Sequence, residues 1–158
     1  MDYSRYKCLQ ATQQDRILTI ALNRPESLNA INDELHAELS EIFADIAKDG
    51  DTNVVVLTGK GRAFCAGGDI KWFQHMTPEQ LDDLFTEARK IILDLLEVEQ
   101  PIIAAVNGAA TGLGATIALF SDVIIAAENA KIGDPHVQVG VVAGDGGAVI
   151  WPWLVGAA

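Results

Sequence analysis

Short runs of consecutive apolar residues alternate along the chain with longer stretches in which apolar residues recur at helical spacing. The runs at residues 17–22, 54–57, 101–106 and 122–127 predict strands. Continuous apolar runs are typical of strands that are covered on both faces. Because strand and helix patterns alternate, we expect a layered α/β fold in which the strands pair largely in parallel.

Two of the predicted helices have well-defined ends. The first begins near Asn32 and stops at Gly50, a residue type that often follows a helix. The second begins after Thr77, where Pro78 and Gln80 complete a capping-box pattern. Its apolar residues follow a period of 3.6 and predict a buried stripe of Leu81, Leu84, Phe85, Ala88, Ile91, Ile92, Leu95 and Leu96.

The uncharged segment at residues 100–121 has the length and apolar character of a membrane span. However, Pro101, Asn107 and three glycines interrupt it, so we predict a strand, a loop and a helix instead. A second uncharged segment, residues 146–158, is rich in tryptophan. We expect its apolar surface to be covered by more chain or by a partner.

Composition narrows the function classes. The 158 residues, of which 49% are apolar, fit one domain spanning residues 1–158. The net charge of -11 argues against nucleic acid and against an anionic membrane surface as partners. Only Cys8 and Cys65 are present, and the start of the chain lacks a signal-peptide pattern, so we expect a cytoplasmic protein without a disulfide.

Two glycine-rich turns carry the main functional signal. Residues 62–70 follow the second apolar run, and their Gly68 precedes a predicted short helix, where backbone amides are free. Residues 107–114 form a second turn of the same kind. Two such turns on neighbouring strands can direct two N–H groups at one oxygen, as in an oxyanion hole. The alternative is a pair of ordinary close-packed turns between strand and helix.

The candidate base is His136, which lies in a loop bounded by glycine and proline, whereas we expect His36 and His75 at the surface. Asp145 follows nine residues later. An imidazole held by a carboxylate is a common general base for activating water. The alternative is that Asp145 caps a helix and His136 is an ordinary loop residue.

Other chemistries have little support in the sequence. No partner set with metal-ligand spacing accompanies Asp134 and His136, and there is no Gly-x-Ser-x-Gly elbow. The turn at residues 112–114 lacks the third glycine and the downstream acidic residue of a dinucleotide fingerprint. We therefore expect neither a metal nor a nucleotide cofactor.

Several motifs, in order along nearly the whole chain, resemble the enoyl-CoA hydratase/isomerase (crotonase) family. They are Leu22-Asn23-Arg24-Pro25, Leu28-Asn29-Ala30, the segment at 63–69, the segment at 107–114, and Ser121-Asp122. The resemblance implies a ββα spiral core, here without the family's C-terminal helical region. It also implies an acyl-CoA substrate, with coenzyme A as part of that substrate, and assembly of the full-length protein as a homotrimer or hexamer.

The resemblance further implies roles for individual residues. Gly68 and Leu113 match the positions whose amides hold the thioester oxygen. The backbone around Ala66 matches the adenine site. Arg24 and Arg62 are expected near the CoA phosphates, and Asp69 and Ile70 belong to the same substrate-binding segment.

Two positions depart from the hydratase pattern. The family's paired glutamates fall at Thr116 and His136, so hydration by two glutamates is not expected. His136 with Asp145, followed by Trp151-Pro152, is more similar to the branch of β-diketone hydrolases such as oxocamphor hydrolase, which perform retro-Claisen C–C cleavage. Three hypotheses follow: hydration, isomerisation or hydrolysis of an acyl-CoA; β-diketone hydrolysis; or a catalytically silent fragment or binding subunit.

Overall fold

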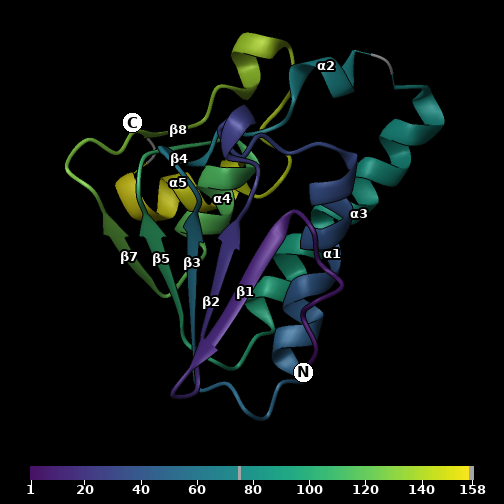
Figure 1. Ribbon diagram of the computed structural model, residues 1–158. Helices are drawn as coiled ribbons and strands as arrows, with labels where there is room; N and C mark the ends of the chain where they lie inside the picture. The colour runs from purple at the N-terminus through teal and green to yellow at the C-terminus, as the bar shows by residue number, and fades with distance from the viewer. Residues whose placement is uncertain (75, 157–158) are drawn as a thin grey trace.

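The computed structural model describes residues 1–74 and 76–156 and contains two sheets (Figure 1). The larger sheet has the strand order β1 (Leu9–Gln14), β2 (Ile17–Leu22), β3 (Val54–Gly59), β5 (Ile102–Val106) and β7 (Val123–Ala126). The smaller sheet consists of β4 (Ala63–Cys65), β6 (Ala109–Thr111) and β8 (Ile132–Gly133). All pairs are parallel except β1 with β2.

The chain winds as a spiral that adds one strand to each sheet in turn. β3 is followed by β4, β5 by β6, and β7 by β8. An earlier coil contributes Ile31, which forms a parallel bridge with Gly68 at the edge of the smaller sheet. This arrangement confirms the predicted α/β class and the ββα spiral core.

The helices begin where the sequence predicts caps. Asn32 caps α1 (Asp33–Ala47) by accepting the Leu35 N–H at 3.1 Å. Thr77 and Gln80 form the predicted capping box of α3 (Pro78–Leu96). The remaining helices are α2 (Ile70–Phe73), α4 (Leu113–Leu119), α5 (Gly147–Val155) and the 3₁₀ turns η1 (Pro25–Ser27) and η2 (His136–Val139).

α1 and α3 lie side by side (Figure 1), and the core forms where they pack on the larger sheet. Leu84, Ile91, Ile92 and Leu95 of the predicted α3 stripe are buried. The prediction is wrong for Phe85 and Leu96, which are 58% and 55% exposed. A helix that packs on one neighbouring helix buries a narrower stripe than the 3.6-residue pattern suggests.

The predicted strands β2, β3, β5 and β7 are all present. The sequence pattern also predicted that all four are buried, and this is wrong for β7. Its Val123, Ile124 and Ile125 are exposed, because β7 is the edge of the larger sheet and pairs only with β5. The segment at 100–121 divides into β5, β6 and α4, as predicted. Within residues 1–74 and 76–156, no helix has the length and hydropathy needed to cross a bilayer.

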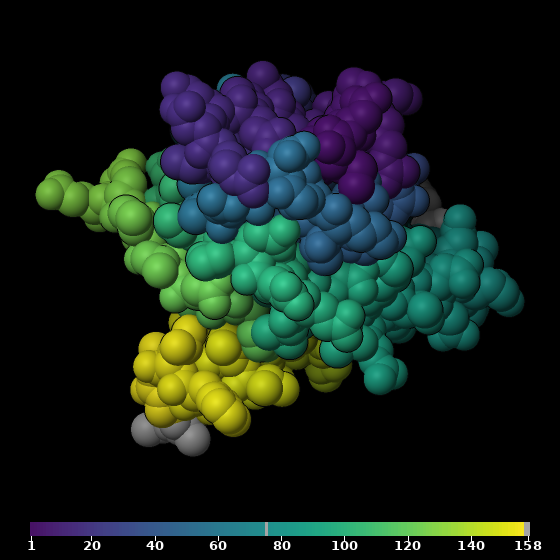
Figure 2. All heavy atoms as spheres, turned by 90° about the horizontal axis from the view of Figure 1, so that it is seen from below, coloured from purple at the N-terminus to yellow at the C-terminus, as the bar shows by residue number. Residues whose placement is uncertain are grey.

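The apolar segment after residue 146 forms α5, a helix that the sequence analysis considered only as the alternative in which Asp145 caps a helix. Figure 2 shows α5 at the surface, on the opposite side of that view from the N-terminal strands. Trp153 and Val155 on this helix are 85% and 70% exposed. α5 contacts α4, and this contact brings its N-terminal end beside the candidate site.

Candidate active site

The two glycine turns lie side by side because β4 and β6 pair in parallel. A Cβ atom placed on Gly67 would come within 3.0 Å of the Thr111 carbonyl oxygen, and one on Gly112 within 3.7 Å of the Gly67 Cα. Gly67 and Gly112 also have φ values of 81° and 53°, which favour glycine. The positive φ values therefore favour glycine at both positions, and the close Thr111 carbonyl adds to this preference at Gly67.

Each turn presents a backbone N–H group with no protein partner among the described residues. The bridge to Ile31 uses the Gly67 carbonyl and the Asp69 N–H, both at 2.8 Å, so the Gly68 N–H points away from Ile31. Leu113 is the first residue of α4, whose first hydrogen bond is donated by Thr116 at 3.0 Å. Its N–H is one of the free donors at a helix start.

Two side-chain amides, those of buried Asn29 and half-buried Asn107, hold the loop that leads to the first turn. Asn29, in a left-handed conformation with φ of 56°, donates through Nδ2 to three carbonyls within residues 60–64 at 2.9 to 3.2 Å. Asn107 accepts the Gly59 N–H at 3.2 Å and donates back to the Gly59 carbonyl at 2.9 Å. The family motifs contain both asparagines, but no pattern in the sequence pointed to this role, because it depends on contacts between residues more than 30 positions apart.

His136 reaches the turns from η2, which follows β8. Its Cε1 and Nε2 atoms both lie 3.6 Å from the position that a Cβ on Gly112 would take. Its Nδ1 is hydrogen-bonded to Asp134, whose Oδ1 also accepts the His136 backbone N–H at 3.1 Å. Its Nε2 lies 3.4 Å from Oδ2 of Asp145. Each ring nitrogen therefore faces a carboxylate.

Asp145 joins this histidine to α4 and α5. Its Oδ1 accepts the Thr116 hydroxyl and the Gly147 N–H, each at 3.2 Å. Its Oδ2 is buried without a hydrogen-bond partner in the described part of the chain, and the side chain is only 9% exposed. Asp145 is not the N-cap of α5, which is Gly146, but one of its oxygens accepts the first N–H of that helix while the other faces His136.

Thr116 lies fully buried on α4, and its hydroxyl has the Gly112 carbonyl as a second acceptor at 3.2 Å. The structure thus brings together all five residues predicted as catalytic, which are Gly68, Leu113, Thr116, His136 and Asp145. Asp134 is an addition that the sequence pattern did not identify as a partner of His136.

The predicted substrate-binding residues surround the first turn. The guanidinium of Arg24 donates to the Ala30 carbonyl, and Arg62 is exposed. The Ala66 N–H donates to the Leu28 carbonyl at 3.1 Å, so at Ala66 only the carbonyl is left to accept from a ligand. Asp69 caps α2 by accepting the Lys71 N–H at 3.0 Å, and the neighbouring Ile70 is 57% exposed.

Phe73 of α2 covers the Gly68 backbone. A Cβ on Gly68 would overlap its ring, and Phe73 itself is 39% exposed. The side chain therefore lies at the entrance to the Gly68 turn, on a helix of only four residues.

His36 corrects one expectation from the sequence. It is 3% exposed, not at the surface, because α3 packs over this part of α1 and Glu87 binds its Nδ1 at 2.8 Å. Burial lowers the pKa of His36, while Glu87 acts in the opposite direction. His75 lies outside the described residues.

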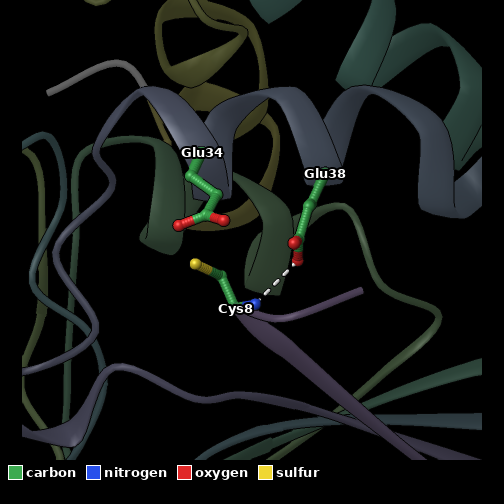
Figure 3. Close-up of side chains that lie close together, drawn as sticks. All are labelled: Cys8, Glu34 and Glu38. Atoms are coloured by element: carbon green, nitrogen blue, oxygen red, sulfur yellow. Dashed lines mark hydrogen bonds between the residues drawn. The ribbon is translucent and has the colours of Figure 1, made fainter. Parts of the chain in front are cut away.

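The two cysteines are unsuited to nucleophilic chemistry. Burial raises the pKa of the Cys65 thiol to about 12. Burial, together with the charges of Glu38 and Glu34, raises the pKa of Cys8 to about 11. Figure 3 shows both glutamates reaching from α1 toward Cys8 at the start of β1. Glu38 accepts three consecutive backbone N–H groups there, at 2.7 to 3.0 Å, so this cluster fastens β1 to α1.

Like Cys8, Glu34 and Glu38, the three candidate-site residues Asp134, His136 and Asp145 are of types that can bind a metal ion and lie close together. Asp134 and Asp145 face different nitrogens of the ring. With Nδ1 engaged by Asp134, only Nε2 and the Asp145 carboxylate are left to share one ion. Catalytic zinc sites typically use three protein ligands.

The sequence of motifs and the geometry of the two turns agree with a comparison to known families. The family model described as enoyl-CoA hydratase/isomerase matches residues 12–158. The chain belongs to this family. The enoyl-CoA hydratase/isomerase spiral thus accounts for the alternation of strands between the two sheets.

Individual relatives of this family support the assignment. The chain is 37% identical to 1,2-epoxyphenylacetyl-CoA isomerase of Escherichia coli over 146 residues, which cover 90% of this chain and 56% of the relative. It is 32% identical to crotonyl-CoA hydratase of Syntrophomonas wolfei over 152 residues, covering 96% and 58%. The chain therefore spans little more than half the length of these relatives.

Solved structures in the enoyl-CoA hydratase/isomerase family have the same fold. An enoyl-CoA hydratase/isomerase from Mycobacterium paratuberculosis superposes with a TM-score of 0.89 at 39% identity, covering 92% of this chain and 59% of that one. An enoyl-CoA hydratase from Bacillus anthracis gives 0.90 at 33% identity, covering 96% and 60%. The crotonase-like spiral expected from the motifs is confirmed.

Proposed function

We propose that this protein acts on an acyl-CoA thioester and that the Gly68 and Leu113 N–H groups bind the thioester oxygen. The observation that carries the proposal is the pair of unpartnered N–H groups, within the described residues, on two touching turns. Each donor aimed at a developing oxyanion contributes about 3 kcal/mol to the transition state. Relatives named as hydratases and isomerases of CoA thioesters support this substrate class.

In the proposed reaction His136 moves the proton. Binding the thioester oxygen at Gly68 and Leu113 stabilises the enolate that forms when a proton leaves the α carbon, or when water adds to the β carbon of an enoyl group. The imidazole Nε2 lies beside the Gly112 turn and is the proposed general base and acid. Asp145 and Thr116 supply polar contacts on the same side. Coenzyme A enters as part of the substrate, and the proposal requires no separate cofactor or metal.

The proposed binding of coenzyme A uses the loop before α2. The carbonyl of Ala66 is the proposed acceptor for the adenine amine, since its N–H is already bound within the protein. Arg24 and Arg62 are the proposed partners of the phosphates, and exposed Ile70 with neighbouring Asp69 borders the same segment. The proposed assembly of the full-length protein is a trimer or hexamer.

A second candidate function is hydrolysis of a β-diketone. It is favoured by the replacement of paired carboxylates with Thr116 and His136, next to a buried carboxylate oxygen of Asp145. In this reaction His136 removes a proton from water, and the resulting hydroxide adds to one carbonyl. The C–C bond then breaks, its electron pair passes to the carbon between the carbonyls, and the Gly68 and Leu113 N–H groups hold the resulting enolate. The enolate carbon finally takes the proton that His136 removed from water, which gives the ketone and restores the neutral imidazole.

The test compares three substrates: crotonyl-CoA for hydration, a 3-enoyl-CoA for isomerisation, and a cyclic β-diketone for C–C cleavage. We expect turnover of a CoA thioester, reduced about 10²- to 10⁴-fold in a His136→Ala variant because general acid–base catalysis contributes that much. Gln138→Ala, which alters an exposed residue of the same η2 turn, is the matched control. Unchanged activity in His136→Ala would exclude the proposed role of the histidine.

The same samples distinguish an enzyme from a silent binding subunit. Sedimentation reports the oligomeric state, and titration with coenzyme A reports binding. A well-folded protein that binds coenzyme A but turns over none of the three substrates would support the silent hypothesis and contradict the proposed function.

A further inference from the structure

Asp134 and Asp145 make different kinds of contact with His136. Asp134 precedes the histidine by two residues, and its Oδ1 accepts both the backbone N–H, at 3.1 Å, and a bond from ring Nδ1. Because the turn fixes the backbone and the ring together, Asp134 defines the orientation of the imidazole. Asp145 faces Nε2 at 3.4 Å, without the geometry of a hydrogen bond.

The surroundings confine the Asp134 carboxylate to this position. Its other oxygen, Oδ2, lies 2.5 Å from where a Cβ on Gly147 would be, so the first residue of α5 must be glycine to leave it room. The side chains of Asp134 and His136 are 17% and 18% exposed. The close approach of α5 therefore leaves the Asp134 carboxylate little room to turn away from the ring.

We propose that Asp134, and not Asp145, is the positioning residue of His136. Its carboxylate accepts a hydrogen bond from Nδ1–H, so the proton stays on Nδ1, and Nε2 is the proton-accepting atom beside the oxyanion turns. The nitrogen that carries the proton in a neutral imidazole is set by the hydrogen bond that the other nitrogen makes. The catalytic consequence rests on the proposed function, but the tautomer itself does not.

This assignment changes the role of Asp145. With the proton on Nδ1, the Nε2 lone pair and the free Oδ2 of Asp145 are two acceptors 3.4 Å apart that face the same space. A proton accepted by Nε2 would therefore lie next to the buried Asp145 carboxylate. Asp145 then lies next to Nε2, the atom that accepts the reacting proton, and not next to Nδ1, the atom whose contact orients the ring.

The deciding measurement is the ¹⁵N spectrum of the His136 ring, recorded across the pH range in which imidazoles titrate and assigned with a His136→Gln sample. In the wild type we expect a neutral ring with hydrogen on Nδ1. Asp134→Asn keeps an oxygen that accepts the His136 backbone N–H, so the turn is retained, but this oxygen carries no negative charge and is a weaker acceptor for Nδ1–H. We expect this variant to lose the Nδ1–H tautomer as the dominant form.

The matched variant is Asp145→Asn, which removes the carboxylate on the other side of the same ring. We expect it to keep the Nδ1–H tautomer. The reverse pattern, with the tautomer changed by Asp145→Asn and unchanged by Asp134→Asn, would overturn the proposal, and so would a wild-type ring protonated on Nε2. If Asp134→Asn does not fold, the wild-type and Asp145→Asn spectra still decide the question.

Kinetics add a second readout. Loss of an orienting carboxylate with the turn retained should lower kcat about 10²- to 10⁴-fold while KM changes little, because the wrong tautomer is presented to the substrate. A tautomer change in Asp134→Asn, together with a wild type that turns over no acyl-CoA, would support the positioning role and reject the proposed function. An unchanged kcat in a variant with a changed tautomer would reject the catalytic consequence.

Discussion

Replacing Asn29 tests whether the loop that leads to the first glycine turn is held by a buried side-chain amide. Asn29 has no exposed surface, and its side chain makes four hydrogen bonds. Three are donated to the carbonyls of Lys60, Ala63 and Phe64, and one is accepted from the Arg24 N–H at 2.9 Å. Asn29→Gly removes all four and retains a residue that tolerates the left-handed φ of 56°.

The magnitude follows from these contacts. A typical intramolecular hydrogen bond contributes about 0.5–1.5 kcal/mol, and a buried group left unpaired costs about 1–3 kcal/mol. Because the two amide hydrogens are shared among three carbonyls, we expect Asn29→Gly to lower the free energy of unfolding by about 2–4 kcal/mol. Asn29→Ala adds about 1 kcal/mol of left-handed backbone strain. Asn29→Asp should be the least stable, since it places a negative charge against three carbonyl oxygens.

The assay is urea denaturation followed by tryptophan fluorescence and circular dichroism. Asn53→Ala is the matched control, because Asn53 is exposed and its side chain accepts a single hydrogen bond, from Arg16 Nε at 3.0 Å. We expect the control to change stability by less than about 0.5 kcal/mol. An Asn29→Gly variant as stable as this control, or an Asn29→Asp variant more stable than Asn29→Gly, would refute the clamping role.

Three further predictions address other parts of the fold. Gly114→Ala places a Cβ 2.6 Å from the Sγ of Cys65, so overpacking between α4 and β4 should lower the free energy of unfolding by about 1–3 kcal/mol. Urea denaturation measures this change, and an unaffected midpoint would contradict the contact. Burial raises the pKa of Cys65 to about 12, so this thiol should resist iodoacetamide at mildly alkaline pH until the protein unfolds. If mass spectrometry found Cys65 labelled in the native protein, its burial would be disproved. Burial lowers the folded-state pKa of His36, so the unfolded chain binds that proton more readily. The contribution of His36 to stability is therefore complete above its ordinary pKa and lost as the pH falls below it, and denaturation of His36→Gln should show a smaller loss over this interval than the wild type.

Elements with their own sequence pattern could be predicted, whereas those that depend on the spiral could not. α1 and α3 carry caps and a 3.6-residue period, and β2, β3 and β5 are continuous apolar runs. β4, β6 and β8 have two or three residues each, too few for a periodic signal. They form because each coil of the spiral stacks on the previous one, and that contact joins residues far apart in sequence.

The candidate site divides in the same way. Gly68, Leu113 and His136 could be identified from glycine turns, the loop around the histidine and the family motifs. The contact between Asp134 and Nδ1 could not, because an aspartate two residues before a histidine is equally typical of a simple turn. Its role depends on the direction of the ring, which α5 and the Gly112 turn determine together. The burial of His36 likewise depends on α3, more than 40 residues away.

The pairing of β4 with β6 has a consequence for how the chemistry of this fold can change. Paired strands lie about 4.8 Å apart, so two N–H groups at equivalent points of successive coils are one strand spacing apart and can both reach a single oxygen. Backbone hydrogen bonding fixes this distance, and only the glycines of the turns constrain the sequence there. The part that stabilises negative charge is thus insulated from side-chain substitution. Under the proposed function, the choice among products would then fall to positions 116, 136 and 145, which lie beside these turns on α4, on η2 and just before α5.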